Sequence, residues 1–144
     1  MDYAELASEL LQKMRLFHQA RPLQNINETL CGETFVLRFV ACRESGVPPG
    51  NISREMGVSS ARIAAALGKL ENKGLITRQI DKNDRRKILV EITQDGKEVA
   101  EKHMRSALAV AEEVLKSLGE TDAKEYVRIT GRLAEIYSER QETP

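Results

Sequence analysis

The fold is decided by residues 59–93, which read SSARIAAALGKLENKGLITRQIDKNDRRKILVEIT. The first part has apolar side chains at the spacing of one helix face. After Gly74, apolar and polar residues alternate, which is the period of a β-strand. We therefore predict a helix over residues 59–73, followed by a β-hairpin with strands at residues 76–80 and 88–92.

A shorter helix is predicted directly upstream, from Pro49 to Met56, because proline is accepted in the first turn of a helix. Gly57 can adopt the positive φ that ends a helix, and Val58 would fill the turn that follows. Two helices joined by a tight glycine turn form a helix-turn-helix. Together with the hairpin, residues 48–93 are predicted to form a winged helix-turn-helix. Its wing is the loop DKNDRRK, which is too polar for a core.

The flanking segments are predicted to be helical, apart from a loop over residues 22–27. A central helix, residues 33–44, is apolar on most of its circumference and should be buried on several sides. The helices in residues 1–21 and 94–140 carry more apolar surface than one winged unit can cover, which favours a homodimer. The predicted class is mainly α with a small β-hairpin (α+β), in a single domain, residues 1–144, with dimerisation helices at both ends.

The charge distribution is polarised although the chain is formally neutral, with 22 basic and 22 acidic residues. Residues 54–87 contain nine basic and four acidic residues, a net charge of +5, and the remainder of the chain carries −5. Clustered positive charge is the electrostatic signature of a phosphate-binding surface. The neutral total therefore does not exclude a nucleic-acid partner.

Enzymatic, metal-binding and membrane functions find no support in the composition. Two histidines, two separated cysteines and no phosphate-binding glycine loop leave the chain without a recognisable catalytic or metal-ligand set. No apolar run approaches the length of a membrane span, and the first residues, MDYAE, lack the basic start of a signal peptide. We expect a cytoplasmic protein that is not an enzyme and uses no cofactor.

Three motifs resemble the signature of the MarR family, the multiple antibiotic resistance regulators. They are LENKGLITR at residues 70–78, Asp84-Arg85-Arg86, and ITQDG at residues 92–96. The order of elements is similar over nearly the whole chain. The resemblance implies a homodimer whose terminal helices interdigitate, and a repressor of a pseudo-palindromic operator that small aromatic ligands or cysteine oxidation release. It also matches Arg86 to the family's minor-groove arginine and Asp84 to the acid that orients it.

Double-stranded DNA is thus the expected partner, and an α-helix fits its major groove. The candidate DNA contacts on the 59–73 helix are Ser59, Ser60 and Arg62 in the first turn, and Lys69. Lys69 would contact the phosphate backbone of the DNA. Arg62 suits guanine because its guanidinium donates two parallel hydrogen bonds. Alanines and a glycine fill much of the remaining helix, so base reading should be sparse. The candidate contacts in the wing are Lys82, Asp84, Arg85, Arg86 and Lys87.

Candidates for an effector pocket are Phe17, His18, Phe35 and Phe39, for which packing in the core or at an interface is the alternative. Cys31 is the candidate redox residue, while Cys42 is expected to pack inertly on the apolar side of the central helix. The competing hypothesis for the whole chain is a winged helix that binds another protein and reads no DNA. A basic loop that is merely solvated would fit that alternative.

Overall fold

The computed structural model describes residues 2–141, with residues 22, 25 and 139–141 described by their backbone alone. It contains one two-stranded antiparallel sheet and is otherwise helical in its regular elements, which confirms the predicted fold class. The described elements are α1 (Tyr3–Gln19), α2 (Arg21–Cys31), α3 (Glu33–Ala41), α4 (Pro49–Met56), α5 (Ser60–Asn72), β1 (Ile76–Ile80), β2 (Ile88–Ile92), α6 (Gln94–Leu118) and α7 (Glu120–Gln141). The chain divides after Leu108 into two compact units.

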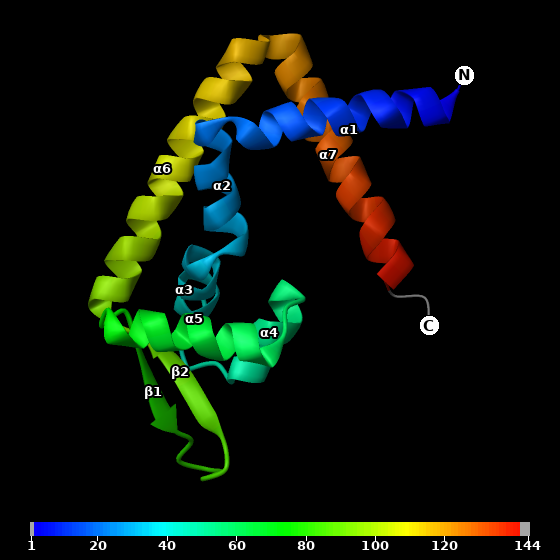
Figure 1. Cartoon of the computed structure of the whole chain (residues 1–144). Helices are drawn as coiled ribbons and strands as arrows, with labels where there is room; N and C mark the ends of the chain where they lie inside the picture. The colour runs from blue at the N-terminus through cyan, green and yellow to red at the C-terminus, as the bar shows by residue number, and fades with distance from the viewer. Residues whose placement is uncertain (1, 142–144) are drawn as a thin grey trace. The chain divides into compact units, whose positions relative to one another are not determined.

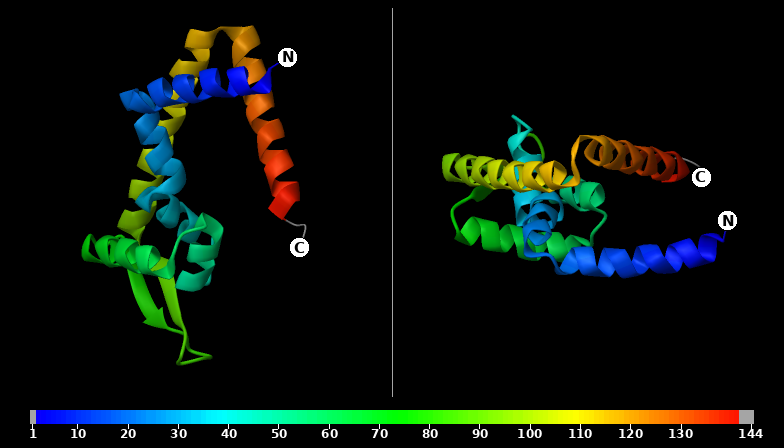
Figure 2. Two further views of the ribbon diagram at one scale, coloured as in Figure 1. Left: turned by 45° about the vertical axis from the view of Figure 1, so that its right-hand side comes forward. Right: turned by 90° about the horizontal axis from the view of Figure 1, so that it is seen from above.

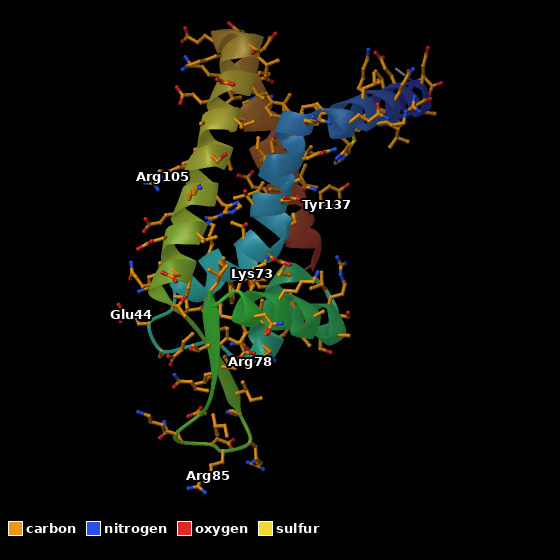
Figure 3. All side chains as sticks on the ribbon, turned by 60° about the vertical axis from the view of Figure 1, so that its left-hand side comes forward. Glu44, Lys73, Arg78, Arg85, Arg105 and Tyr137 are labelled. Atoms are coloured by element: carbon orange, nitrogen blue, oxygen red, sulfur yellow. The ribbon has the colours of Figure 1, made fainter. Side chains whose placement is uncertain are left out.

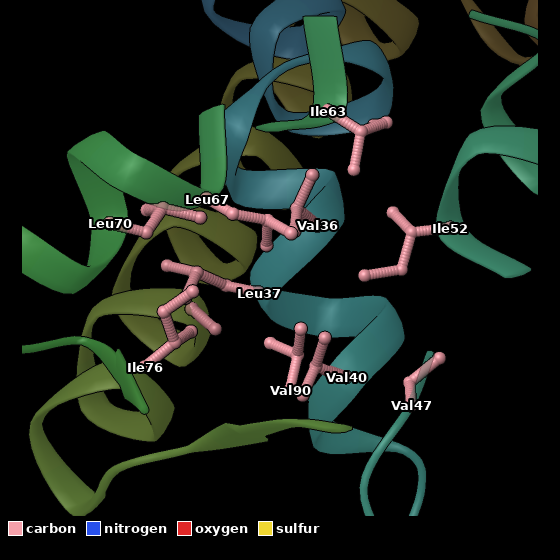
Figure 4. Close-up of a cluster of buried hydrophobic side chains, with 11 residues drawn as sticks. Val36, Leu37, Val40, Val47, Ile52, Ile63, Leu67, Leu70, Ile76 and Val90 are labelled. Carbon is pink, nitrogen blue, oxygen red and sulfur yellow. The ribbon is translucent and has the colours of Figure 1, made fainter. Parts of the chain in front are cut away.

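The core of the first unit is built around α3, whose side chains Val36, Leu37 and Val40 are all buried (Figure 4). Because these residues point in different directions, α3 contacts several elements at once, as predicted for a central helix. The remaining members of the buried cluster come from the other elements of the unit. They are Val47, Ile52, Ile63, Leu67, Leu70, Ile76, Val90 and Ala100.

The helix-turn-helix forms as the sequence predicts. Gly57 ends α4 with φ 63° and ψ 31°, the left-handed conformation that favours glycine. In the turn, the hydroxyl of Ser53 donates to the carbonyl of Val58 over 2.6 Å. Val58 itself packs against the core cluster. The turn is thus fixed by both a backbone conformation and a hydrogen bond, and α5 starts from a defined position.

The hairpin pairs β1 with β2 in the register Ile76↔Ile92 to Ile80↔Ile88. The chain before α4 adds an isolated bridge, in which the amide and carbonyl of Val47 pair with those of Val90 at 2.9 and 2.8 Å. The sequence pattern did not indicate this bridge. In Figures 1 and 2 the hairpin extends beyond the helices, and its loop lies at the opposite end of the first unit from α1.

Thr93 joins α5, the hairpin and α6. Its hydroxyl donates to the carbonyl of Gly74 over 2.7 Å and accepts from the amide of Gly96 over 3.0 Å, so it caps α6 as predicted. Its own amide donates to the carbonyl of Leu75 over 3.0 Å. Gly96 is buried against the same segment, and a Cβ there would lie 2.0 Å from the carbonyl oxygen of Leu75. The junction therefore requires both a hydroxyl at 93 and a glycine at 96.

Three details of the prediction are wrong. Residues 22–27 are not a loop but lie in α2. Proline is tolerated in the first turn of a helix, and here it lies at the start of a second helix. The central helix ends at Ala41 rather than residue 44. Cys42 follows it and is exposed, so it does not pack in the core.

The second unit contains the end of α6 and the whole of α7. Among the described side chains of α7, all except Ala123 are exposed, although several are large and apolar. These are Tyr126, Val127, Ile129, Leu133, Ile136 and Tyr137. The helix begins two residues before the predicted start at residue 122.

The contact at Gly96 gives a stability prediction. Gly96→Ala should lower the free energy of unfolding by about 1–3 kcal/mol, because the added methyl group collides with backbone at Leu75 that cannot move without disturbing the hairpin. Gly68→Ala is the matched control, since a Cβ there has nothing within 4 Å and alanine favours the helix by up to about 1 kcal/mol. Urea unfolding of both variants measures the difference. Equal stabilities for the two variants would contradict the close packing of Gly96 against Leu75.

Candidate nucleic-acid interface

Helix α5 separates its residues cleanly into two faces. Ile63, Leu67 and Leu70 are buried in the core, while Arg62 and the alanines beside it are exposed. Ser59 is the N-cap residue, and its hydroxyl accepts from the amide of Arg62 over 3.3 Å. This cap leaves Ser60 and Arg62 exposed in the first turn, as the predicted contact surface requires.

Lys69 and Lys73 belong to a different surface of α5. Both approach the carboxylate of Glu33 at the start of α3, with Nζ–Oε distances of 4.0 and 3.0 Å. The ion pairs link the end of α5 to α3 across 40 residues of sequence in the case of Lys73. Lys69 therefore already has an anionic neighbour within the chain, which reduces its availability for a phosphate.

Arg78 anchors the hairpin to α5. Its guanidinium donates to the carboxylate of Glu71, with Nε 2.8 Å from Oε2 and a second contact from Nη2. The label in Figure 3 places Arg78 on the hairpin next to the helices. Sequence reasoning counted this arginine only as a charge, although its place within the LENKGLITR motif could have suggested a local pairing with the glutamate.

The loop between the strands is closed by its own hydrogen bonds. The amide of Asp81 donates to the carbonyl of Lys87 over 2.9 Å, and the amide of Lys87 donates to the carbonyl of Asp84 over 2.9 Å. The carboxylate of Asp81 accepts from the amide of Asn83 over 2.8 Å. The bond between the Asp81 carboxylate and the Asn83 amide is typical of an Asx turn, and together the three bonds give the polar loop a defined backbone.

Within this loop Asp84 holds Arg86. The Oδ1 atom of Asp84 accepts from the amide of Arg86 over 3.1 Å and from its side-chain Nε over 3.2 Å. The side chain of Arg86 is nevertheless 91% exposed, whereas that of Asp84 is 29% exposed. The carboxylate thus binds the Nε atom of Arg86, so that the two terminal nitrogens of the guanidinium can donate to a ligand.

The same contacts keep Asp84 ionised. The backbone amide of Arg86 has the largest effect and its guanidinium the next, and together with the positive charge of Lys87 they lower the pKa of Asp84. Because the pKa is lowered, the contact is present at neutral pH and is lost only as the pH falls through the pKa of the folded protein.

The other predicted wing residues surround this pair. Lys82, Arg85 and Lys87 are exposed, and Figure 3 shows Arg85 pointing away from the protein at the far end of the hairpin. No carboxylate in the described residues is recorded as an ion-pair partner of these three. The loop therefore presents a concentrated positive surface beyond the helices.

The structure brings two of the four effector-pocket candidates together. Phe35 and Phe39 stack on α3 with ring centroids 6.1 Å apart, and the guanidinium carbon of Arg43 lies 3.7 Å from the centre of the Phe39 ring. Phe17 and His18 are exposed near the end of α1. None of the four is among the residues that line the cavity between α3 and α6.

A cavity of about 600 Å³ lies instead between α3 and α6 in the first unit. Its apolar lining includes Ala41, Ala100 and Met104, and Arg38 and Arg105 add positive charge. Cys42 also lines it, whereas Cys31 lies at a smaller cavity of about 180 Å³ that Arg62 shares. Both cysteines are free and exposed. The sequence could not reveal the larger cavity, because its lining comes from helices far apart in the chain.

No group of three histidine, cysteine, aspartate or glutamate side chains among residues 2–141 could hold a metal ion. In the part of the chain that the structure describes, no helix is sufficiently long and apolar to span a membrane.

Residues 33–110, more than half of the 144-residue chain, match a family model described as a winged helix DNA-binding domain. The chain belongs to this winged helix family. The matched range includes α3, the helix-turn-helix, the hairpin and the first part of α6. The surface described above is therefore the wing and exposed helix of a winged helix domain.

Three relatives extend the comparison. An uncharacterised HTH-type transcriptional regulator of Bacillus subtilis, YwhA, is 26% identical over 101 residues, covering 70% of this chain and 72% of YwhA. The structure of Streptococcus pneumoniae FabT in complex with DNA matches with a TM-score of 0.69 and 21% identity, covering 99% and 100% of the two chains. A MarR transcriptional regulator from Methanosarcina mazei Go1 matches with a TM-score of 0.68 and 22% identity, covering 97% and 99%. The predicted resemblance to the MarR family is confirmed at the level of the fold.

The pairing of Asp84 with Arg86 predicts a titration result. Arg86→Ala should raise the pKa of the Asp84 carboxyl only in part, because the side-chain hydrogen bond is lost while the larger contribution of the backbone amide remains. Carboxyl-carbon NMR over acidic pH measures this pKa. Lys82→Ala is the control, since the Lys82 side chain is not among the causes of the shift. An unchanged titration in Arg86→Ala would refute the side-chain contact.

Proposed function

We propose that this chain is a sequence-specific DNA-binding transcription regulator, a homodimeric repressor of a pseudo-palindromic operator that a small ligand releases. The observation that carries the proposal is the Asp84–Arg86 pair at the end of the hairpin. An arginine that is held at its base and 91% exposed is suited to enter a narrow, negatively charged minor groove. The hairpin extends beyond the helices (Figure 1), so the wing would enter the minor groove while α5 lies in the neighbouring major groove.

The remaining contacts divide between reading and anchoring. Ser59, Ser60 and Arg62 at the start of α5 face outward, and Arg62 is the side chain suited to a guanine edge. Lys82, Arg85 and Lys87 supply phosphate contacts that position the wing. We assign Lys69 a minor role, because Glu33 neutralises part of its charge. The structure of FabT, which shares this fold, is a complex with DNA and supports DNA as the partner proposed for this chain.

The proposed dimer rests on apolar surface that the single chain leaves uncovered. α1 has no buried residue, yet Leu6, Leu10, Met14 and Phe17 follow one another at helical spacing. α7 leaves a similar set of apolar side chains exposed. A second copy of the chain would bury these apolar faces, and a two-fold dimer would present two α5 helices about 34 Å apart, one turn of DNA.

The cavity between α3 and α6 supports the proposed release by a ligand. Its volume of about 600 Å³ lies within the range of small-molecule sites, roughly 300–1,000 Å³. The apolar lining would accept a small aromatic compound, and Arg38 and Arg105 would favour one that carries negative charge.

The first test of this function is a shift of duplex DNA by the purified protein. We expect affinity to fall steeply with salt, since bound phosphates release counterions, and Arg86→Ala to weaken binding about ten-fold or more. The same titration with Asn72→Ala, an exposed residue at the end of α5, is the control and should change little. If binding were absent or independent of salt, the chain would instead be a protein-interaction module.

A second prediction separates reading from anchoring. Once an operator has been selected from genomic fragments, Arg62→Ala should reduce the ratio of operator to random-DNA affinity by about ten-fold, because a base contact is lost. Lys82→Ala should weaken binding to both DNAs equally and leave this ratio unchanged. Competition binding with the two duplexes measures both ratios. Equal changes of the affinity ratio in the two variants would disprove that Arg62 contacts a base while Lys82 contacts phosphate.

A further inference from the structure

Two large apolar side chains are exposed on the wing itself. Ile80 and Ile88, the last cross-strand pair before the loop, are 65% and 48% exposed. The alternation of the sequence puts Ile80 on the same face as Ile76, which is buried. Ile76 is covered by the core, whereas Ile80 is in solvent, because the hairpin extends beyond the helices that cover its base.

The residues between Ile80 and Ile88 carry net positive charge, because four basic side chains outnumber Asp81 and Asp84. Lys87 precedes Ile88 directly, Lys82 is two residues after Ile80, and the loop between them carries Arg85 and Arg86. An apolar patch rimmed by positive charge suits a partner that offers apolar surface between anionic groups. The walls of a DNA groove have this character, because the C–H groups of each deoxyribose lie between phosphates.

We infer that the Ile80–Ile88 pair packs against the deoxyribose wall of the groove that Arg86 enters, and that it is an apolar determinant of DNA affinity. The inference rests on the proposed function. Apolar side chains are used at minor grooves by other DNA-binding proteins, where they contact or separate the stacked bases. Here the pair lies on the strands and not at the tip, so a contact with the groove wall fits its position better than insertion between bases.

A second copy of the chain is a weaker candidate for this surface. Two isoleucine side chains fall far short of the roughly 800 Å² that each partner buries in a stable protein interface. The helix α1, whose apolar residues are proposed to form the dimer, also lies at the opposite end of the first unit from the hairpin (Figure 2).

The contact of the isoleucine pair with DNA can be recognised from the salt dependence of affinity, since burial of apolar surface releases no counterions. Phosphate contacts contribute about 0.9 each to the slope of log affinity against log salt concentration. Loss of an apolar contact should lower affinity at every salt concentration and leave the slope unchanged. The salt dependence therefore distinguishes the isoleucine pair from the lysines beside it.

The experiment compares three variants of the full chain on a mixed-sequence duplex of about 30 base pairs, roughly three helical turns. The double variant Ile80→Thr/Ile88→Thr keeps β-branched side chains and hence the strands, but should bind about ten-fold more weakly with an unchanged salt slope. The double variant Ile80→Val/Ile88→Val should stay within about two-fold of the original chain, because its surface remains apolar. Lys87→Gln should lower the slope by about 0.9.

The outcomes are separable. If the original chain fails to bind the duplex, the proposed function itself is wrong. If it binds with a steep salt dependence and the threonine variant binds equally well, only the role of the isoleucine pair is refuted. A fall in slope for the threonine variant would equally overturn the inference. A change in its sedimentation would assign the pair to contacts between copies, while an unchanged thermal midpoint and sedimentation would complete the support.

Discussion

The hydroxyl of Thr93 links the two parts of the domain that must keep a fixed relation. It donates to the carbonyl of Gly74, which follows α5, and it accepts from the amide of Gly96 in the first turn of α6. The backbone of the same residue pairs with Leu75, where the chain enters the hairpin. Because Thr93 bonds to both sides, a rotation of α5 away from the hairpin would break its hydrogen bonds to Gly74 and Leu75.

This rigid junction explains how a small hairpin can present charge at a distance. The core provides the base of the hairpin through Ile76 and Val90, and Arg78 ties the adjoining strand to α5. Beyond these anchors the strands continue without cover, so the loop is placed by the geometry of the sheet. The internal hydrogen bonds of the loop then orient Arg86 through Asp84.

The basic side chains of the domain fall into two groups, those paired with carboxylates of the chain and those left available for DNA. Arg78, Lys69 and Lys73 pair with carboxylates of neighbouring helices and contribute to the fixed geometry of the domain. Such partly exposed pairs are individually weak, about 1 kcal/mol or less, yet they define which cations remain available. Those left in the wing and at the start of α5 form the surface to which we assign DNA binding. The net charge of the basic segment therefore overstates the number of residues that can contact phosphate.

The sequence by itself determined the helix-turn-helix with its turn at Gly57, both strands and the polar composition of the wing, because these depend on periodicity and turn preference within a few residues; it did not reveal α2. Only the tertiary structure decided the pairing of Lys73 with Glu33, which are 40 residues apart, and the exposure of Ile80. It also decided that Gly96 lies against Leu75 and that α3 and α6 enclose a cavity. Periodicity states which side of a strand is apolar, but whether that side is covered depends on where distant helices end.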